Sequence, residues 1–155
     1  LCRVNPPMRS DVIELPEAME AAELVAGETE AAEYCTYTGS NILEWHTSRM
    51  YDLVFMGNII HHFSRDEIRT LLEKVFARIV CGGMLAAWDL SADPGGEDPT
   101  AACFSLFFYI TSASRCYSPQ EIEALIADTG FLDFEMLRPP GGSTHALYLA
   151  RKPAS

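Results

Sequence analysis

Hydrophobic positions along this chain switch between the periods of strands and helices, most clearly in its middle third. Residues 51–56 are apolar almost without interruption after Asp52, which predicts a strand buried on both faces. Residues 84–88 predict a second apolar strand. Between them, apolar side chains recur at helical spacing over three turns, at Ile68, Leu71, Leu72, Val75, Phe76 and Ile79. This order predicts a βαβ unit, whose parallel strands carry chemistry at their carboxyl ends.

Polar residues and glycines mark where two helices begin and end. Ser64 and Glu67 form the pattern of a capping box ahead of the central helix. The glycine pair Gly82-Gly83 is expected to terminate that helix. Ser118 and Glu121 form a second capping pattern, and Gly130 is expected to end the helix that follows.

Shorter elements flank this central unit. Residues 11–15 predict a short buried strand that ends in an acid, and residues 34–38 predict another strand. Residues 101–114 are apolar on most sides and predict a buried helix or a pocket wall. Residues 131–137 and 144–150 predict two strands, and their short link makes the pair antiparallel. A parallel sheet that ends in a reversed strand differs from an all-parallel dinucleotide-binding fold.

Composition narrows the classes of partner. The 155 residues suffice for one domain at most, and they carry a formal net charge of −11. Nucleic acids and anionic membranes attract clustered Lys and Arg, so this acidity argues against both. No apolar run approaches the roughly 18 residues of a membrane span. The five cysteines are widely spread without metal-ligand spacing, which favours free thiols and a cytoplasmic location.

Two groups suited to acid–base chemistry fall at the ends of the central strands. His61 follows the first strand, and its imidazole can take a proton from a hydroxyl near neutral pH. Asp89 ends the second strand, and a carboxylate there can fix the tautomer of the histidine. A histidine that caps the next helix and a solvated loop acid are the structural alternatives. His62 is expected to leave the turn on a different side, and no third ligand has spacing that favours a metal site.

Three short motifs occur in the order found in a known family. The turn Ile60-His61-His62-Phe63, the segment Glu14-Leu15-Pro16 and the turn Gly39-Ser40-Asn41-Ile42 resemble motifs of class I S-adenosylmethionine-dependent methyltransferases. The resemblance is closest to the O-methyltransferases that act on small-molecule hydroxyls. It implies an α/β fold, a Rossmann-like three-layer sandwich with an antiparallel final β-hairpin. Residues 1–155 would then be a partial catalytic domain that runs from the second strand to the C-terminus.

The same resemblance assigns roles to individual residues. His61 occupies the position of the catalytic general base, and Asp89 occupies the position of the acid that orients it. The cofactor S-adenosylmethionine is expected to contact five residues, namely Glu14, Asn41, Ile42, Gly57 and Phe63. Among these, Glu14 would bind the ribose hydroxyls. An exposed glutamate and an ordinary turn asparagine are the structural alternatives for Glu14 and Asn41.

One element of the family pattern is missing from these residues. The Asp/Glu-x-Gly-x-Gly loop after the first strand of the fold does not occur, and the chain begins at Leu1 instead of Met. We therefore expect a fold truncated at its N-terminus, with its first strand absent. Unpaired strand edges near Ile13 and Val54 would make this segment unstable alone or close its sheet differently. A homodimer is expected to form through a domain outside this chain.

The sequence therefore predicts O-methyl transfer to a small, aromatic or polyketide-like hydroxyl, with His61 as the base. Two alternatives stay open. A non-catalytic methyltransferase-like domain that acts through partner contacts is favoured by the missing glycine loop. A nicotinamide-dependent Rossmann oxidoreductase is disfavoured by the antiparallel final hairpin.

Overall fold

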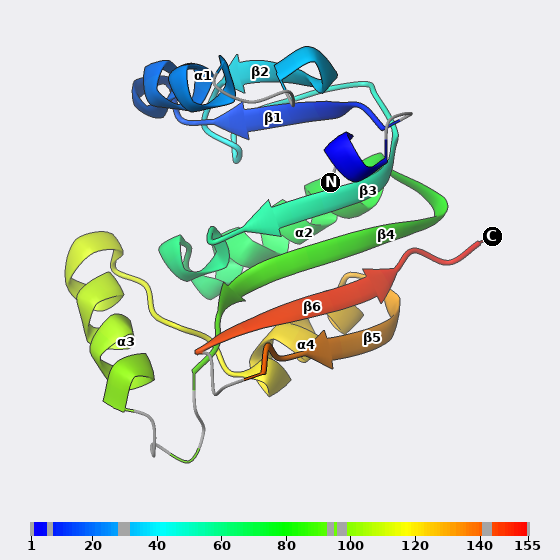
Figure 1. Cartoon of the computed structure of the whole chain (residues 1–155). Coiled ribbons are helices and arrows are strands. Elements are labelled where there is room, and N and C mark those ends of the chain that lie inside the picture. Colours follow the sequence, from blue (N-terminus) through cyan, green and yellow to red (C-terminus); the bar gives the residue numbers. More distant parts are fainter. Residues whose placement is uncertain are drawn as a thin grey trace. The chain divides into compact units, whose positions relative to one another are not determined.

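The computed structural model describes residues 2–5, 8–27, 32–92, 95, 99–140 and 144–154 (Figure 1). The chain divides into two compact units, Leu1–Thr47 and Ser48–Ser155. Their described strands form two separate sheets, one of two strands and one of four. The strands that contain Ile13 and Val54 accordingly belong to different sheets.

The first unit is built on a pair of parallel strands. Its elements are η1 (Cys2–Val4), β1 (Ser10–Glu14), η2 (Pro16–Ala18), α1 (Met19–Gly27), η3 (Ala32–Tyr34) and β2 (Cys35–Gly39). Strands β1 and β2 are paired from Ser10 with Cys35 to Glu14 with Gly39. Pro16 opens the helical segment η2, because its fixed φ suits the first turn of a helix.

The second unit contains a four-stranded sheet in the order β3-β4-β6-β5. These strands are β3 (Tyr51–Gly57), β4 (Ile79–Leu90), β5 (Leu132–Leu137) and β6 (His145–Arg151). Strands β3 and β4 are parallel, whereas β6 runs antiparallel to both β4 and β5. The predicted α/β class and the reversed final hairpin are therefore confirmed.

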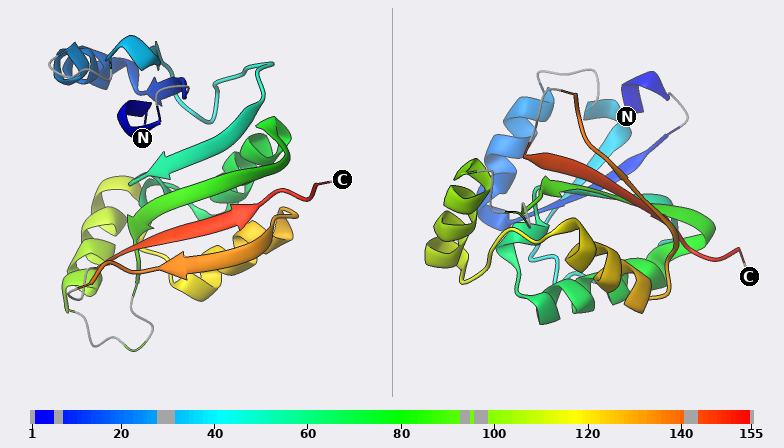
Figure 2. Two further views of the ribbon diagram at one scale, coloured as in Figure 1. Left: turned by 45° about the vertical axis from the view of Figure 1, so that its right-hand side comes forward. Right: turned by 90° about the horizontal axis from the view of Figure 1, so that it is seen from below.

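Helices of the second unit cover one face of this sheet and one of its ends. They are η4 (Ile60–His62), α2 (Arg65–Arg78), α3 (Pro99–Ser112) and α4 (Pro119–Asp128). Helices α2 and α4 lie on the same face, and α3 lies beyond the carboxyl ends of β3 and β4 (Figures 1 and 2). Both predicted capping boxes are present, at Ser64 with Glu67 and at Ser118 with Glu121. The core between helices and sheet is made by Ile68, Leu71, Leu72, Ile122, Leu125, Ile126, Leu85, Ala87 and Tyr148.

Burial differs from the sequence prediction at two elements. Strand β3 is not buried on both faces, because Met56 is buried whereas Phe55 keeps 52% of its surface exposed. Helix α3 forms, but it is not a buried helix. Only Ala101 and Phe108 are buried there, and Tyr109 and Ile110 are 70% and 74% exposed. An apolar pattern predicts the type of element, but what covers it depends on the elements that pack around it.

The end of α2 also differs from the prediction. The helix ends at Arg78 rather than at the glycine pair, and Ile79 already begins β4. The ammonium of Lys152, from the far end of the chain, donates hydrogen bonds to the carbonyl oxygens of Phe76 and Ile79 at 2.7 and 2.8 Å. A Cβ on Gly83 would lie 2.7 Å from a methyl carbon of Ile79. The glycine pair therefore lies inside β4, where the pairing with β3 shifts register, and a distant lysine binds carbonyls at the junction of α2 and β4.

Candidate active site

A sharp turn after β3 carries the two adjacent histidines to the carboxyl end of β4. Asn58 adopts a positive φ of 51°, and its N–H donates to the carbonyl oxygen of Trp88 at 2.8 Å. The chain then forms the short helix η4, which contains both histidines. Because Trp88 directly precedes Asp89, this bond brings the turn beside the acid near the carboxyl end of β4.

His61 and Asp89 form a buried pair within this turn. Nδ1 of His61 lies 2.5 Å from Oδ1 of Asp89, and the two residues are only 5% and 2% exposed. The carboxylate also accepts hydrogen bonds from the N–H of Ile60 and the N–H of Leu90, each at 2.7 Å. The two oxygens of Asp89 are thus held in place by the backbone as well as by the imidazole. The structure thus brings together the two residues that the sequence singled out for acid–base chemistry.

The second histidine also belongs to this cluster. The prediction that His62 leaves the turn on a different side is wrong, because its Nε2 lies 3.1 Å from Nε2 of His61. Nδ1 of His62 faces the hydroxyl of Ser112 at 3.4 Å, and the residue is exposed. Partial desolvation lowers the pKa of His62, the neighbouring His61 lowers it further, and Asp89 opposes this shift.

Helix α3 closes the cluster from one side. The ring of Phe108 is buried and lies 4.0 Å from the ring of His61, centroid to centroid. Phe108 also meets the ring of His62 edge-on at 5.4 Å. The apolar helix predicted as a pocket wall therefore contributes one aromatic residue to the histidine cluster, although most of its other apolar side chains are exposed.

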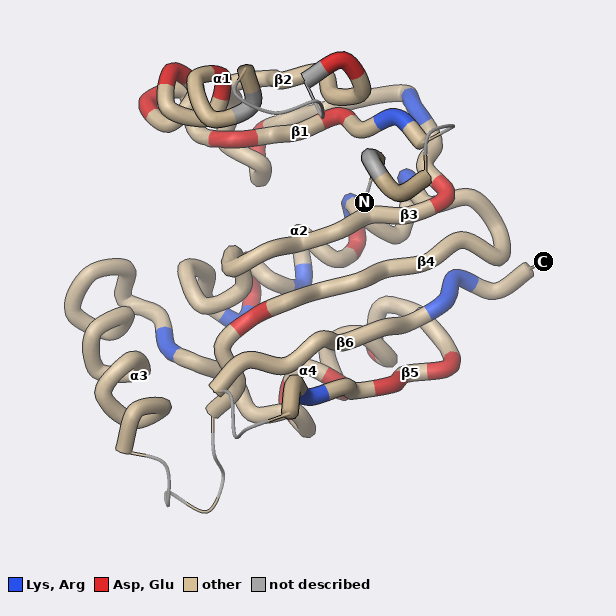
Figure 3. Tube along the Cα trace, in the orientation of Figure 1, with Lys and Arg blue, Asp and Glu red and all other residues tan. Residues whose placement is uncertain are grey.

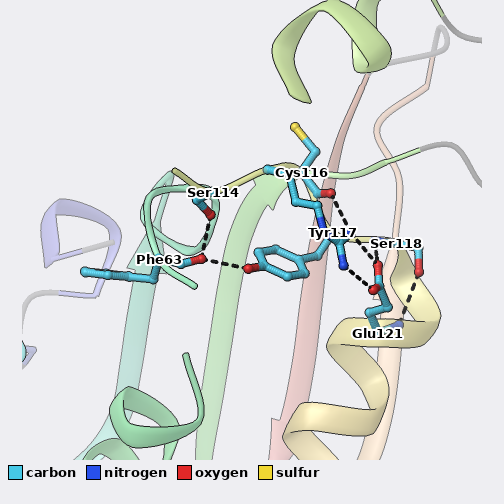
Figure 4. Close-up of polar contacts among 7 residues, drawn as sticks. Phe63, Ser114, Cys116, Tyr117, Ser118 and Glu121 are labelled. Carbon is cyan, nitrogen blue, oxygen red and sulfur yellow. Dashed lines mark hydrogen bonds and ion pairs between the residues drawn. The ribbon is translucent and has the colours of Figure 1, made fainter. Parts of the chain in front are cut away.

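Two hydroxyl groups anchor the end of the histidine turn. The carbonyl oxygen of Phe63 accepts hydrogen bonds from Oγ of Ser114 at 2.6 Å and from the phenol of Tyr117 at 2.8 Å (Figure 4). Ser114 and Tyr117 lie more than fifty residues beyond the turn in sequence. Sequence reasoning missed both residues, because no local pattern indicates a donor for a backbone carbonyl so far away.

Tyr117 is contacted in turn by Arg115, which is paired with Glu121 in the first turn of α4. The guanidinium of Arg115 lies over its ring at 4.6 Å and forms two hydrogen bonds with the carboxylate of Glu121. This pairing, with the N–H of Ser118, lowers the pKa of Glu121 to about 2. The capping residues of α4 are thereby linked to the histidine turn through Tyr117.

The residues expected to bind the cofactor divide between the two units. In the first unit, Glu14 is exposed at the carboxyl end of β1, and Ser40 donates its N–H to the carbonyl oxygen of Glu14 at 2.8 Å. The turn that contains Asn41 therefore lies beside the end of β1. Oδ1 of Asn41 accepts the N–H of Leu43 at 3.0 Å, and Ile42 is half-buried.

The second unit contains the two remaining residues, Gly57 and Phe63. Gly57 is the last residue of β3, and a Cβ there would lie 2.9 Å from the ring of Phe55. Phe63 ends the histidine turn and is half-buried. In the part of the chain that the structure describes, no group of three or more His, Cys, Asp or Glu side chains could hold a metal ion. No helix of that part is long and apolar enough to cross a membrane.

Comparisons with known proteins agree on one family. Residues 1–132 match the O-methyltransferase domain family. The chain is 25% identical over 158 residues to the tetracenomycin polyketide synthesis 8-O-methyl transferase TcmO of Streptomyces glaucescens, covering 99% of this chain and 45% of that protein. It is 28% identical over 102 residues to the acetylserotonin O-methyltransferase of Bos taurus, covering 65% of this chain and 29% of that protein.

Solved structures extend the comparison to the fold. The human N-acetylserotonin methyltransferase in complex with SAM superposes with a TM-score of 0.83 at 19% identity, over 98% of this chain and 43% of that chain. This chain therefore spans less than half the length of each of these proteins. The match covers most of the chain, and the buried His61–Asp89 pair lies within it. The chain belongs to the O-methyltransferase domain family.

Proposed function

We propose that this chain is part of an S-adenosylmethionine-dependent O-methyltransferase that acts on a hydroxyl of a small aromatic or polyketide-like molecule. The observation that carries the proposal is the buried 2.5 Å contact between His61 and Asp89. Methyl transfer to a hydroxyl benefits from a base, because a neutral hydroxyl is a poor nucleophile. The family match and the names of the two relatives support the same class of reaction.

In this proposal His61 is the general base and Asp89 fixes its orientation. The carboxylate accepts the Nδ1–H of His61, so that the lone pair of the neutral ring lies on Nε2. Nε2 is then the atom that gains a proton as the hydroxyl loses one, and Asp89 stabilises the imidazolium. A base in this position contributes roughly two to four orders of magnitude to the rate, and positioning of the reactants contributes the remainder.

The bound cofactor would supply an electrophilic methyl group on its sulfonium sulfur. The residues proposed to hold it are Glu14, Asn41, Ile42, Gly57 and Phe63. Their chemistry fits the nucleoside part of the cofactor. The exposed carboxylate of Glu14 can accept hydrogen bonds from two ribose hydroxyls, and the apolar side chains of Ile42 and Phe63 suit an adenine ring.

Family membership disfavours the nicotinamide-dependent alternative, whereas a non-catalytic domain is still a competing proposal. The two are separated by calorimetry of the full-length protein with S-adenosylmethionine, followed by transfer of a labelled methyl group to a panel of phenols. Binding together with transfer supports the enzyme. A folded full-length protein that binds no cofactor would favour a non-catalytic role.

The same proposal extends to partners and location. Acidic positions are concentrated around β1, η2 and α1 (Figure 3), which fits a small-molecule substrate better than nucleic acid or an anionic membrane. All five cysteines are free, which fits a cytoplasmic protein. We also expect the full-length protein to form a homodimer, which light scattering after size-exclusion chromatography will test.

A further inference from the structure

The two adjacent histidines face each other through the same ring nitrogen. Nε2 of His61 and Nε2 of His62 lie 3.1 Å apart, and the ring centroids are 4.3 Å apart. At this distance one nitrogen must carry a proton and the other a lone pair, because two lone pairs or two N–H groups would repel. The pair therefore shares one proton along the line between the two nitrogens.

The surrounding hydrogen bonds determine which of the two Nε2 atoms carries that proton. Asp89 accepts two backbone N–H groups, so it acts as a carboxylate and His61 donates Nδ1–H to it. A neutral His61 then has its lone pair on Nε2, and His62 must donate its own Nε2–H. The lone pair of His62 consequently lies on Nδ1, on the exposed side of the cluster.

Access decides which nitrogen a hydroxyl can reach in this arrangement. His61 is 5% exposed, both of its nitrogens have partners within the cluster, and Phe108 lies against its ring. His62 is exposed, and the contact of its Nδ1 with Ser112 is long, at 3.4 Å. Nδ1 of His62 is therefore the more accessible basic nitrogen of the pair.

We infer that His62 is a second catalytic residue, which receives the proton of the substrate hydroxyl on Nδ1 and passes a proton from Nε2 to His61. This inference rests on the proposed O-methyl transfer. The O–H bond of the substrate breaks and an N–H bond forms at Nδ1 of His62. At the same time the Nε2–H bond of His62 breaks and an N–H bond forms at Nε2 of His61.

The products of this relay balance in charge and keep the hydrogen bonds of the cluster. The substrate oxygen becomes an anion and attacks, His62 ends as the neutral Nδ1–H tautomer, and His61 becomes an imidazolium beside Asp89. The bond between the two Nε2 atoms is retained with its donor and acceptor exchanged. The proton afterwards leaves to solvent through exposed His62, because His61 is buried.

A spectroscopic experiment tests the pair without cofactor or substrate. In full-length protein labelled with ¹⁵N-histidine, we expect a through-hydrogen-bond coupling between the two Nε2 nuclei at neutral pH. We also expect the Nδ1–H tautomer at His61 and the Nε2–H tautomer at His62. An absent coupling, or the opposite tautomers, overturns the relay whatever the activity of the protein.

The catalytic part is tested with His62→Gln, whose amide can still donate to His61 but cannot pass a proton. We expect methyl transfer to fall by roughly a hundredfold, with unchanged cofactor affinity. His62→Ala should regain activity when imidazole is added, which a purely structural role would not produce. His46→Gln, the same substitution at an exposed histidine of the first unit, is the matched control and should keep the wild-type rate.

The outcomes separate this inference from the proposed function. If His62→Gln transfers methyl groups at the wild-type rate while His61→Ala is inactive, His61 is the base alone and the relay is wrong. If the full-length wild-type protein methylates no hydroxyl, the proposed function fails and the catalytic role of His62 fails with it. Loss in His62→Gln together with imidazole rescue of His62→Ala supports the relay.

Discussion

The phenol of Tyr117 donates a 2.8 Å hydrogen bond to the carbonyl oxygen of Phe63, the residue that ends the histidine turn. This bond joins two segments separated by 54 positions in sequence. The turn that carries His61 is therefore held at both ends, by Asp89 at one end and by Tyr117 with Ser114 at the other. Tyr117 is buried, so the loss of its bond has a measurable cost.

Tyr117→Phe removes this hydrogen bond and keeps the ring. We expect the full-length protein to lose about 1 kcal/mol of stability. We also expect slower methyl transfer, because the histidine turn then has one anchor fewer. Thermal unfolding and initial rates measure the two effects. Tyr109→Phe is the matched control, since Tyr109 is 70% exposed, and its unfolding temperature should stay unchanged. Equal unfolding temperatures for both variants would contradict the anchoring role.

His61→Ala tests the proposed base directly. We expect methyl transfer by the full-length protein to fall by roughly two to four orders of magnitude. Cofactor affinity should be nearly unchanged, because the residues proposed to hold the cofactor are retained. Steady-state kinetics and calorimetry with S-adenosylmethionine check the two statements. A mild loss, similar to that of the control variant His46→Gln, would show that the turn has only a structural role.

Asp89→Asn is expected to affect both stability and rate. The carboxylate accepts the N–H groups of Ile60 and Leu90 as well as His61, and an amide must turn its NH₂ group toward one of these donors. A buried donor left without an acceptor costs about 1–3 kcal/mol. We expect lower stability and a loss of rate that is smaller than for His61→Ala, measured by thermal unfolding and initial rates. Wild-type stability and rate in the Asp89→Asn protein would rule out the orienting role of the acid.

Glu121 makes the stability of the protein depend on pH in the acid range. Its pKa is lowered from 4.5 to about 2 by Arg115, so the folded state favours the carboxylate. The ionised carboxylate of Glu121 contributes its full stabilisation above pH 4.5, and this contribution is lost as the pH falls toward 2. Glu121→Gln should therefore lower the unfolding temperature at neutral pH. The difference from wild type should shrink on acidification.

The control for this prediction lies on the same helix. Glu123 is exposed, and Glu123→Gln should leave the unfolding temperature at neutral pH nearly unchanged. Thermal scans of both variants between pH 2 and 7 give the comparison. A difference between Glu121→Gln and wild type that stays constant over this range would mean that the Arg115 pairing does not shift the pKa of Glu121.

The 155-residue chain by itself is expected to be unstable. Its described strands form a two-stranded and a four-stranded sheet, and a two-stranded sheet alone is marginal in water. We therefore expect the isolated chain to show a broad, weakly cooperative thermal transition when its unfolding is measured by circular dichroism. The full-length protein should unfold more cooperatively. A cooperative transition of the isolated chain at high temperature would refute this prediction.

The local sequence determined the elements whose signals lie within a few residues. The two capping boxes, the apolar spacing of α2 and the short link before β6 each act within one turn or one hairpin. The order of these elements was enough for the α/β class with a reversed final hairpin. The pairing of His61 with Asp89 was also predictable, because the carboxyl ends of adjacent parallel strands meet.

Only the tertiary structure decided features that depend on distant segments. Lys152 donates to the carbonyl of Phe76 in α2 and to that of Ile79 at the start of β4, and the helix ends before the glycine pair. The carbonyl of Phe63 is satisfied by Ser114 and Tyr117, which no local pattern indicates. His62 turns toward His61 in a cluster closed by α3, although neighbours in a turn often point apart. Each of these arrangements depends on how distant segments pack together, which the periodicity of a single segment does not encode.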